Sequence, residues 1–179
     1  MTAADQRPAS GAPSASLPAS LQARFDHVAV AGPRIRDLLP IYRDLLGGRS
    51  AGGGDNPRVG YRALQLGYPD DRRVELMEPL PGSTFFDRFF ARTGGGGMHH
   101  MTFLVPDVRE AIREVEAAGW TPTSIFLENP VWQEVFLHPK ETGGTLVQIV
   151  QAEKRDGPGA TVEEILAGRG TWGTGTPSP

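Results

Sequence analysis

The chain has 179 residues, a formal net charge of −3 and no cysteine. This length suits one compact domain or two small halves with a common core, and the slight acidity argues against a nucleic-acid or anionic-membrane partner. The lack of cysteine excludes disulfides, thiolate nucleophiles and thiolate metal sites, and no apolar run is long enough to span a membrane. We therefore expect a cytoplasmic globular protein.

The first half begins with a polar tail and continues as alternating apolar segments. Residues 1–22 are rich in Ala, Pro and Ser, which predicts a disordered tail. RFDHVAVA (24–31) is predicted to be a strand, and Asp37 is the expected N-cap of the helix that follows it. Two more strands are expected at YRALQLG (61–67) and RVELMEP (73–79), on either side of the turn YPDD.

The second half has the same plan after a short linker. Ser83 is the expected cap of a linker helix that carries several phenylalanines, which we interpret as core residues. MHHMTFLV (98–105) then predicts a strand, and the apolar spacing after it predicts a helix that ends at Gly119. Further strands are expected at 121–127, 132–139 and 145–150.

The two halves form an internal repeat with an offset of 73 positions. HVAVAGPRIRDLLPIYRDLL (27–46) aligns with HMTFLVPDVREAIREVEAAG (100–119), and VELMEPL (74–80) aligns with VQIVQAE (147–153). Each half therefore reads as one β-α-β-β-β module. We predict an α+β domain over residues 23–152, in which two paired modules, about 23–80 and 97–152, form a cupped mixed sheet around a central cleft.

Residues 153–179 extend beyond the repeat. TVEEILAGRG contains a capping box, with Thr161 as the N-cap and Glu164 three positions later, and Gly168 is a suitable stop. We expect a C-terminal extension with one short helix.

Four polar residues occupy equivalent positions in otherwise apolar strands. His27 and His100 align in the repeat, as do Glu75 and Gln148, and 48 positions separate histidine and partner in both halves. Because strand side chains alternate between faces, these four can share one concave surface if the halves curve toward each other, whereas His99 points the other way. Two imidazoles, one carboxylate and one amide oxygen are suitable ligands for a divalent metal, and burying such groups unpaired is costly.

The stretches that carry these residues resemble a known family. DHVAVA, IYRDLLGG, VELMEPLPGSTFFDRFF, GGGMHHMTFLVPDV and FLHPKETGGTLVQIV together cover about residues 24–151. They are similar to the vicinal oxygen chelate superfamily (glyoxalase, bleomycin resistance and dioxygenase proteins), and most of all to methylmalonyl-CoA epimerases. The resemblance implies a homodimer, and one divalent ion (Co, Ni, Mn, Zn or Fe) held by His27, Glu75, His100 and Gln148. It leaves His99 with a packing or orienting role.

The chain departs from the epimerase pattern at the acidic positions. The epimerases' ligands run His, Gln, His, Glu in chain order, whereas this chain has His, Glu, His, Gln. One epimerase base is the last of those ligands, and the other lies in the strand that matches 58–67, where this chain has no carboxylate. Glu75 is the best remaining candidate for proton transfer. Glu134 and His138, on the equivalent strand of the second half, are further catalytic candidates.

Three functions fit these observations. The first is a metal-dependent isomerase or epimerase of a small carbonyl compound, such as a 2-substituted acyl-CoA, that works through a metal-stabilised enolate. The second is a glyoxalase-like lyase or an iron-dependent oxygenase, in which His27, His100 and Glu75 form a two-histidine, one-carboxylate set. The third is a resistance-type protein that binds a small molecule without turnover.

Overall fold

A computed structural model describes residues 21–152 and 159–170 of the chain. The predicted tail therefore lies outside the described residues except for its last two positions, and so do residues 153–158 and 171–179. Within the described part, no helix combines the length and the apolar character that crossing a membrane would need.

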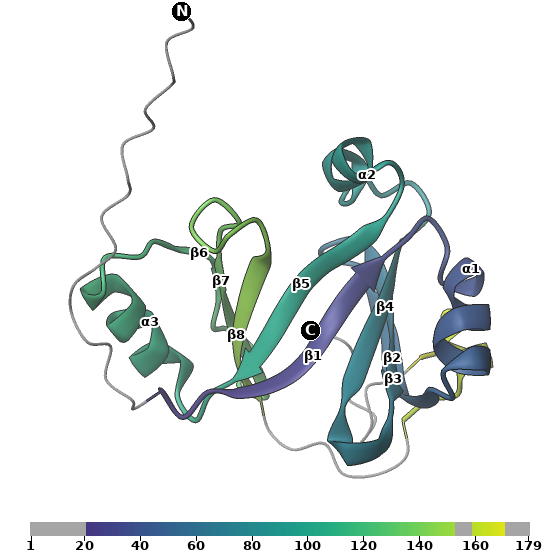
Figure 1. Cartoon of the computed structure of the whole chain (residues 1–179), viewed down its shortest axis with the longest axis horizontal. Coiled ribbons are helices and arrows are strands. Elements are labelled where there is room, and N and C mark those ends of the chain that lie inside the picture. Colours follow the sequence, from purple (N-terminus) through teal and green to yellow (C-terminus); the bar gives the residue numbers. More distant parts are fainter. Residues whose placement is uncertain (1–20, 153–158, 171–179) are drawn as a thin grey trace, which may run out of the picture.

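All eight described strands belong to one mixed sheet. The first module contributes β1 (Arg24–Ala31), β2 (Arg49–Asn56), β3 (Tyr61–Gly67) and β4 (Arg73–Pro79). The second contributes β5 (Gly97–Leu104), β6 (Pro122–Phe126), β7 (Trp132–Leu137) and β8 (Leu146–Ala152). Their spatial order is β2-β3-β4-β1-β5-β8-β7-β6, and the sheet curls into a half-barrel (Figure 1).

The strand register repeats the symmetry of the sequence. β1 pairs in parallel with β4 and β5 pairs in parallel with β8, while the antiparallel β1–β5 pair joins the modules. Ala63 lies opposite Met77, and Glu134 lies opposite Val150, which is 73 positions after Met77. The predicted α+β fold of two paired β-α-β-β-β modules around a cupped sheet is thus confirmed, and Ala63 and Glu134 are structural equivalents.

The helices flank the sheet at its two ends and are capped differently (Figure 1). Asp107 caps α3 (Val108–Ala117), and its side chain accepts hydrogen bonds from two backbone N–H groups. The expected cap at Asp37 is wrong, because α1 (Ile35–Leu39) begins two residues earlier and continues into a π-helix over Pro40–Leu45. The N–H of Ile35 donates instead to Glu78 Oε2 from β4, at 2.7 Å.

Two shorter helices lie outside the repeat. The linker helix α2 (Asp87–Thr93) begins after Phe86 rather than at Ser83, whose hydroxyl accepts the N–H of Phe85 in the preceding turn. The capping box predicted at Thr161 and Glu164 is confirmed at the start of α4 (Val162–Leu166).

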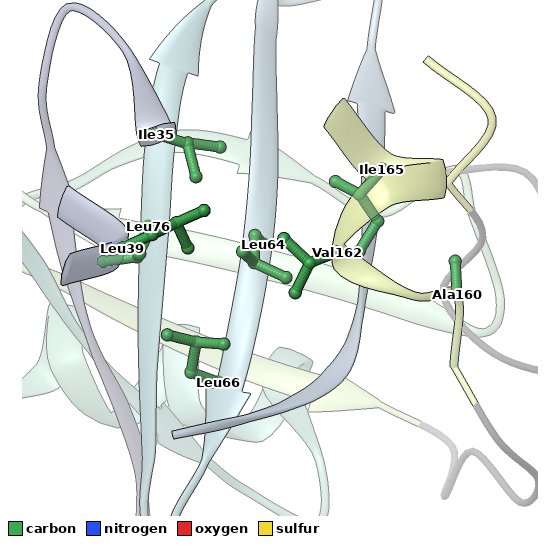
Figure 2. Packing of buried hydrophobic residues seen from close by; sticks show 8 residues of the cluster. All are labelled: Ile35, Leu39, Leu64, Leu66, Leu76, Ala160, Val162 and Ile165. Atoms are coloured by element: carbon green, nitrogen blue, oxygen red, sulfur yellow. The ribbon is translucent and has the colours of Figure 1, made fainter. Parts of the chain in front are cut away.

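Helix α4 is part of the first module's core, although it lies beyond the predicted domain boundary at residue 152. Val162 and Ile165 pack with Leu64 of β3 and with Ile35 and Leu39 of α1 (Figure 2). The second module has its own cluster, built on α3: Val105, Val108, Ala111, Val115, Val135 and Ile149. Both clusters cover the outer face of the curled sheet. A third cluster contains Ala29, Ala31, Ala63, Met77 and Phe86, so the inner face carries apolar as well as polar residues.

Strand β2, which the sequence analysis did not identify, is glycine-rich because other backbone segments approach it closely. A Cβ at Gly53 would lie 2.3 Å from the carbonyl oxygen of Ala63, and one at Gly159 would lie 2.5 Å from Cα of Gly52. Only glycine permits these approaches. The C-terminal segment therefore completes the outer cover of the first module.

Candidate functional site

The inner face of the half-barrel holds a cavity of about 300 Å³. Its lining comes from both modules and includes all four predicted metal ligands: His27, Glu75, His100 and Gln148. Glu134 and several aromatic side chains line it as well. The size is at the lower end of the range for small-molecule sites.

Three of the four predicted ligands form a compact buried group. One ligand atom each from His27, Glu75 and His100 lies within 4.8 Å of the others. The side chains are almost inaccessible to solvent, and Nε2 of His27 is 3.7 Å from Oε2 of Glu75. Metal–ligand bonds of 2.0–2.2 Å require ligand atoms at most about 4.4 Å apart. Small side-chain rotations that move the ligand atoms by a few tenths of an ångström would therefore let the three residues bind one cation.

The protonation of His100 suits a metal ligand. Burial lowers its pKa well below the ordinary value, and the neighbouring His99 and His27 act in the same direction. The imidazole is therefore neutral near pH 7, which is the form that binds metals. Buried polar groups gathered this tightly cost stability unless a common partner satisfies them.

Gln148 lies beside this group with its oxygen on the histidine side. Its Oε1 accepts the hydroxyl of Thr102 at 2.6 Å, and Thr102 Oγ1 is 3.0 Å from Nε2 of His27. Its Nε2 donates to Glu134 Oε2 at 2.6 Å. These two contacts orient the amide so that the oxygen, rather than the nitrogen, is available to a cation near His27.

A β-bulge precedes each of the two histidines. The β1–β5 register shifts between Phe25 and His27, and again opposite His99. Each extra residue breaks the strict alternation of side chains, so Asp26 and His99 reach the ring beside them. His27 Nδ1 lies 2.7 Å from Asp26 Oδ2, and the Nδ1 atoms of His99 and His100 are 2.9 Å apart. Both residues can orient a ligand through its second nitrogen.

The two bulge residues differ in charge. Burial opposes ionisation of Asp26, but its hydrogen bond to His27 and the charges of His27, Arg73 and Arg24 outweigh that effect and lower its pKa. Burial lowers the pKa of His99 to about 4, so this imidazole is neutral. His99 also packs against Phe86 and Phe89, with ring centroids 5.3 and 5.1 Å away. His99 thus has packing and orienting contacts, but the expectation that it points away from the cavity is wrong, because the bulge brings its side chain into the lining.

Glu134 places a second carboxylate in the cavity. Its Oε2 accepts Nε1–H of Trp132 at 2.8 Å as well as the Gln148 amide, and Oε1 has no hydrogen-bond partner within the described residues. Burial raises the pKa of Glu134, and the charge of Glu75 raises it further. The hydrogen bonds from Trp132 and Gln148 and the charge of Arg58 lower the pKa, but the net shift is upward. A carboxyl with a raised pKa and a free oxygen is suited to take up and release a proton.

Thr102, Gln65 and Tyr61 were not singled out from the sequence. The amide of Gln65 donates to Glu75 Oε2 at 3.1 Å. The hydroxyl of Tyr61, which lines the cavity, accepts Nδ2–H of Asn56 at 3.3 Å, so its own proton is available to a ligand. Burial and the charge of Glu75 raise the pKa of Tyr61, which keeps the phenol neutral. Thr102 lies two positions after His100 on β5, so side-chain alternation could have suggested it, but only the assembled sheet reveals the contacts of Gln65 and Tyr61.

The structure does not bring His138 to the cavity. β7 ends at Leu137, and the exposed His138 ring accepts the N–H of Lys140 within the turn that follows. Side-chain alternation stops where the strand stops, so His138 does not share the environment of Glu134. The catalytic role predicted for His138 has no support in this geometry.

Comparisons with known proteins agree with this architecture. Residues 26–130 match the family model of the Glyoxalase/Bleomycin resistance protein/Dioxygenase superfamily. The mitochondrial methylmalonyl-CoA epimerase of Mus musculus is 30% identical over 134 residues, which cover 72% of this chain and 73% of that protein. The ethylmalonyl-CoA/methylmalonyl-CoA epimerase of Cereibacter sphaeroides is 30% identical, with coverage of 72% and 97%. The crystal structure of methylmalonyl-CoA epimerase from Mycobacterium tuberculosis superimposes with a TM-score of 0.64 at 25% identity, covering 73% of this chain and 88% of that one.

Proposed function

The chain belongs to the glyoxalase/bleomycin resistance/dioxygenase superfamily, and from this membership we propose that it is a metal-dependent isomerase of a small carbonyl compound. One observation carries the proposal. The buried group of His27, Glu75 and His100 shares a cavity with a second buried carboxylate, Glu134, that has a raised pKa. The reaction would remove a proton from the carbon next to the carbonyl and return it.

The metal would be held by His27, Glu75 and His100, with the amide oxygen of Gln148 as a fourth ligand. A bound divalent cation would supply the positive charge that stabilises negative charge on a substrate oxygen. Asp26 and His99 orient the two imidazoles from outside, and Gln65 holds the Glu75 carboxylate.

Proton transfer is assigned to Glu134. Its free Oε1 can accept the proton, while the hydrogen bonds from Trp132 and Gln148 to Oε2 hold the carboxylate in place. Glu75, a candidate for both roles, serves here as a ligand, because Gln65 and the two histidines surround it. On the opposite wall, the Tyr61 hydroxyl can donate a hydrogen bond to the substrate oxygen as charge develops there.

The pseudo-symmetry supports this assignment. The resemblance places an epimerase base in the strand that matches 58–67, where this chain has no carboxylate, and Glu134 lies on the equivalent strand of the other module. The ligand carboxylate has changed modules in the opposite direction, to Glu75. We therefore propose that the two modules have exchanged roles relative to the epimerases, with the number of site carboxylates preserved.

The substrate class follows from the relatives. Two of them, about 30% identical to this chain, are named as epimerases of methylmalonyl-CoA or ethylmalonyl-CoA. A 2-substituted acyl thioester is the corresponding proposal for this chain, and a homodimer remains the expected assembly.

Hydrogen exchange tests the proposal. Metal-loaded protein is incubated in deuterated water with 2-substituted acyl-CoAs, including methylmalonyl-CoA, and deuterium at the carbon next to the thioester is measured by mass spectrometry. Incorporation that depends on protein and metal is expected. No incorporation with any acyl-CoA would contradict the isomerase.

A second candidate rests on the ligand types. Two histidines and one carboxylate are also the ligands of iron-dependent oxygenases. Oxygen consumption by the iron-loaded protein with a catecholic substrate, without hydrogen exchange, would favour that function. Ligand binding without either reaction would favour a resistance-type binding protein.

A further inference from the structure

The cavity is lined by aromatic rings on two opposite walls. Tyr61 and Phe85 stand on the side of the first module, with ring centroids 5.6 Å apart, and Phe126, Trp132 and Phe136 come from the second module. Aromatic rings that face each other across a gap offer large apolar surfaces to a flat ligand.

One of these rings is exposed to solvent. Phe85 has 41% of its surface accessible, although it borders a cavity and lies next to the buried Phe86 at a centroid distance of 4.7 Å. An exposed large apolar side chain at the mouth of a pocket is unfavourable until something covers it.

The charges of the lining disfavour a free anion at this place. The ionisable acids of the lining are Glu75 and Glu134, and no lysine or arginine is among the lining residues. The guanidinium of Arg58 stacks over the Phe126 ring at 4.7 Å and is solvent-exposed. An anionic group of a ligand is therefore best accommodated at a cation held by His27, Glu75 and His100, or outside the cavity near Arg58, and not between the rings.

The cavity has room for a ring in addition to the reacting group. An apolar cavity of about 150 Å³ is enough to bind benzene, and this one measures about 300 Å³. The remaining volume can hold a carbonyl group and its neighbouring carbon near the triad.

We propose that the substrate's group next to the carbonyl is aromatic or of similar apolar bulk, bound between Tyr61 and Phe85 on one side and Phe126, Trp132 and Phe136 on the other. This inference rests on the proposed function for the reaction, but the preference for the ring is a binding property of its own.

Two acyl-CoAs with uncharged acyl groups test the preference. Phenylacetyl-CoA and propionyl-CoA have the same carrier and differ by a phenyl or a methyl group on the carbon next to the thioester. Their affinities for the full-length, metal-loaded protein are measured by calorimetry. Phenylacetyl-CoA is expected to bind at least tenfold more tightly, and equal affinity, the reverse order or no binding of either compound would overturn the inference.

Phe85→Ala gives the structural control. This exposed position can lose its ring without opening the core, and the variant should retain no more than about a third of the wild-type preference, since one ring of the aromatic walls is gone. Phe25→Ala removes a similarly exposed ring, 49% accessible, that packs on Phe103 and is not among the lining residues, and it should leave the preference unchanged. Equal effects of the two substitutions would also overturn the inference.

Hydrogen exchange on the same two compounds separates this inference from the proposed function. A binding preference without exchange on these or any other acyl-CoA would retain the aromatic subsite and reject the isomerase. Exchange on both compounds without a preference would retain the isomerase and reject the subsite.

Discussion

The two modules have the same strand register but carry different side chains at equivalent positions of the inner face. Glu75 of β4 corresponds to Gln148 of β8, and Ala63 of β3 corresponds to Glu134 of β7. The carboxylate of the first module thus lies on β4, the strand next to β1, whereas the carboxylate of the second module lies on β7, which β8 separates from β5. The comparison shows that equivalent positions of a duplicated scaffold can carry different side chains while each module contributes one carboxylate to the cavity.

The outer faces differ as well. The core of the second module is built on α3 alone, whereas the core of the first module contains residues of both α1 and α4. We expect the inner difference to affect the proposed chemistry and the outer difference to affect stability, and separate substitutions can test each.

The largest effect is expected from Glu134→Gln, which removes the proton-accepting group that only the second module has. Hydrogen exchange should fall by about 100-fold or more, because a general base contributes rate factors of this order. Metal affinity should stay near that of the wild type, since the triad is unchanged. Glu128→Gln, an exposed acid of the same module, is the matched control. A Glu134→Gln variant with wild-type exchange would remove Glu134 from the mechanism.

Ile165→Ala tests the dependence of the first module on α4. Ile165 is fully buried in the cluster that also contains Leu64 and Ile35, and truncation of such a side chain lowers the free energy of unfolding by about 3 kcal/mol. Denaturant unfolding measures the loss. Leu45→Ala, at a 78% exposed position, should change stability by less than about 0.5 kcal/mol. Similar effects of the two changes would show that α4 does not support the core.

The smallest effect concerns the caps of the equivalent helices. Asp107→Ala should lower the melting temperature by about 2–5 °C, because α3 loses a side-chain cap, whereas Asp37→Ala should have almost no effect on the uncapped α1.

This difference should depend on pH. The backbone N–H of Glu110 holds the pKa of Asp107 below its usual range. A lowered folded-state pKa stabilises the protein above the unfolded pKa, near 4, and this contribution is lost as the pH falls through the folded value. The Asp107→Ala protein and the wild type should therefore converge in melting temperature at strongly acidic pH. A constant difference would show that the charge of Asp107 is irrelevant.

Much of this organisation could be predicted from the sequence, because the repeat fixes equivalent positions without knowledge of the fold. The 73-residue offset and strand alternation brought His27, Glu75, His100 and Gln148 to one surface. β2 was not predicted because its glycine-rich sequence has no apolar alternation, and its close contacts with Ala63 and Gly159 appear only in the folded chain.

The environment of the site could not be predicted in the same way. The contacts of Asp26 and His99 depend on bulges that break the alternation, and His138 was misplaced because the strand ends one residue before it. Local periodicity predicts faces, but bulges and strand ends are decided by pairing with neighbours.

Calorimetric titration with a divalent cation, on chelator-free protein without a histidine tag, is the most direct test of the exchanged site. We predict one ion per chain, and at least tenfold weaker binding in Glu75→Gln, which loses the single anionic ligand, than in Gln148→Ala. The double variant Glu75→Gln with Gln148→Glu restores the epimerases' ligand order and should bind metal again. No divalent binding to the natural sequence, or undiminished affinity in Glu75→Gln, would contradict the metal site and with it the exchange of roles between the modules.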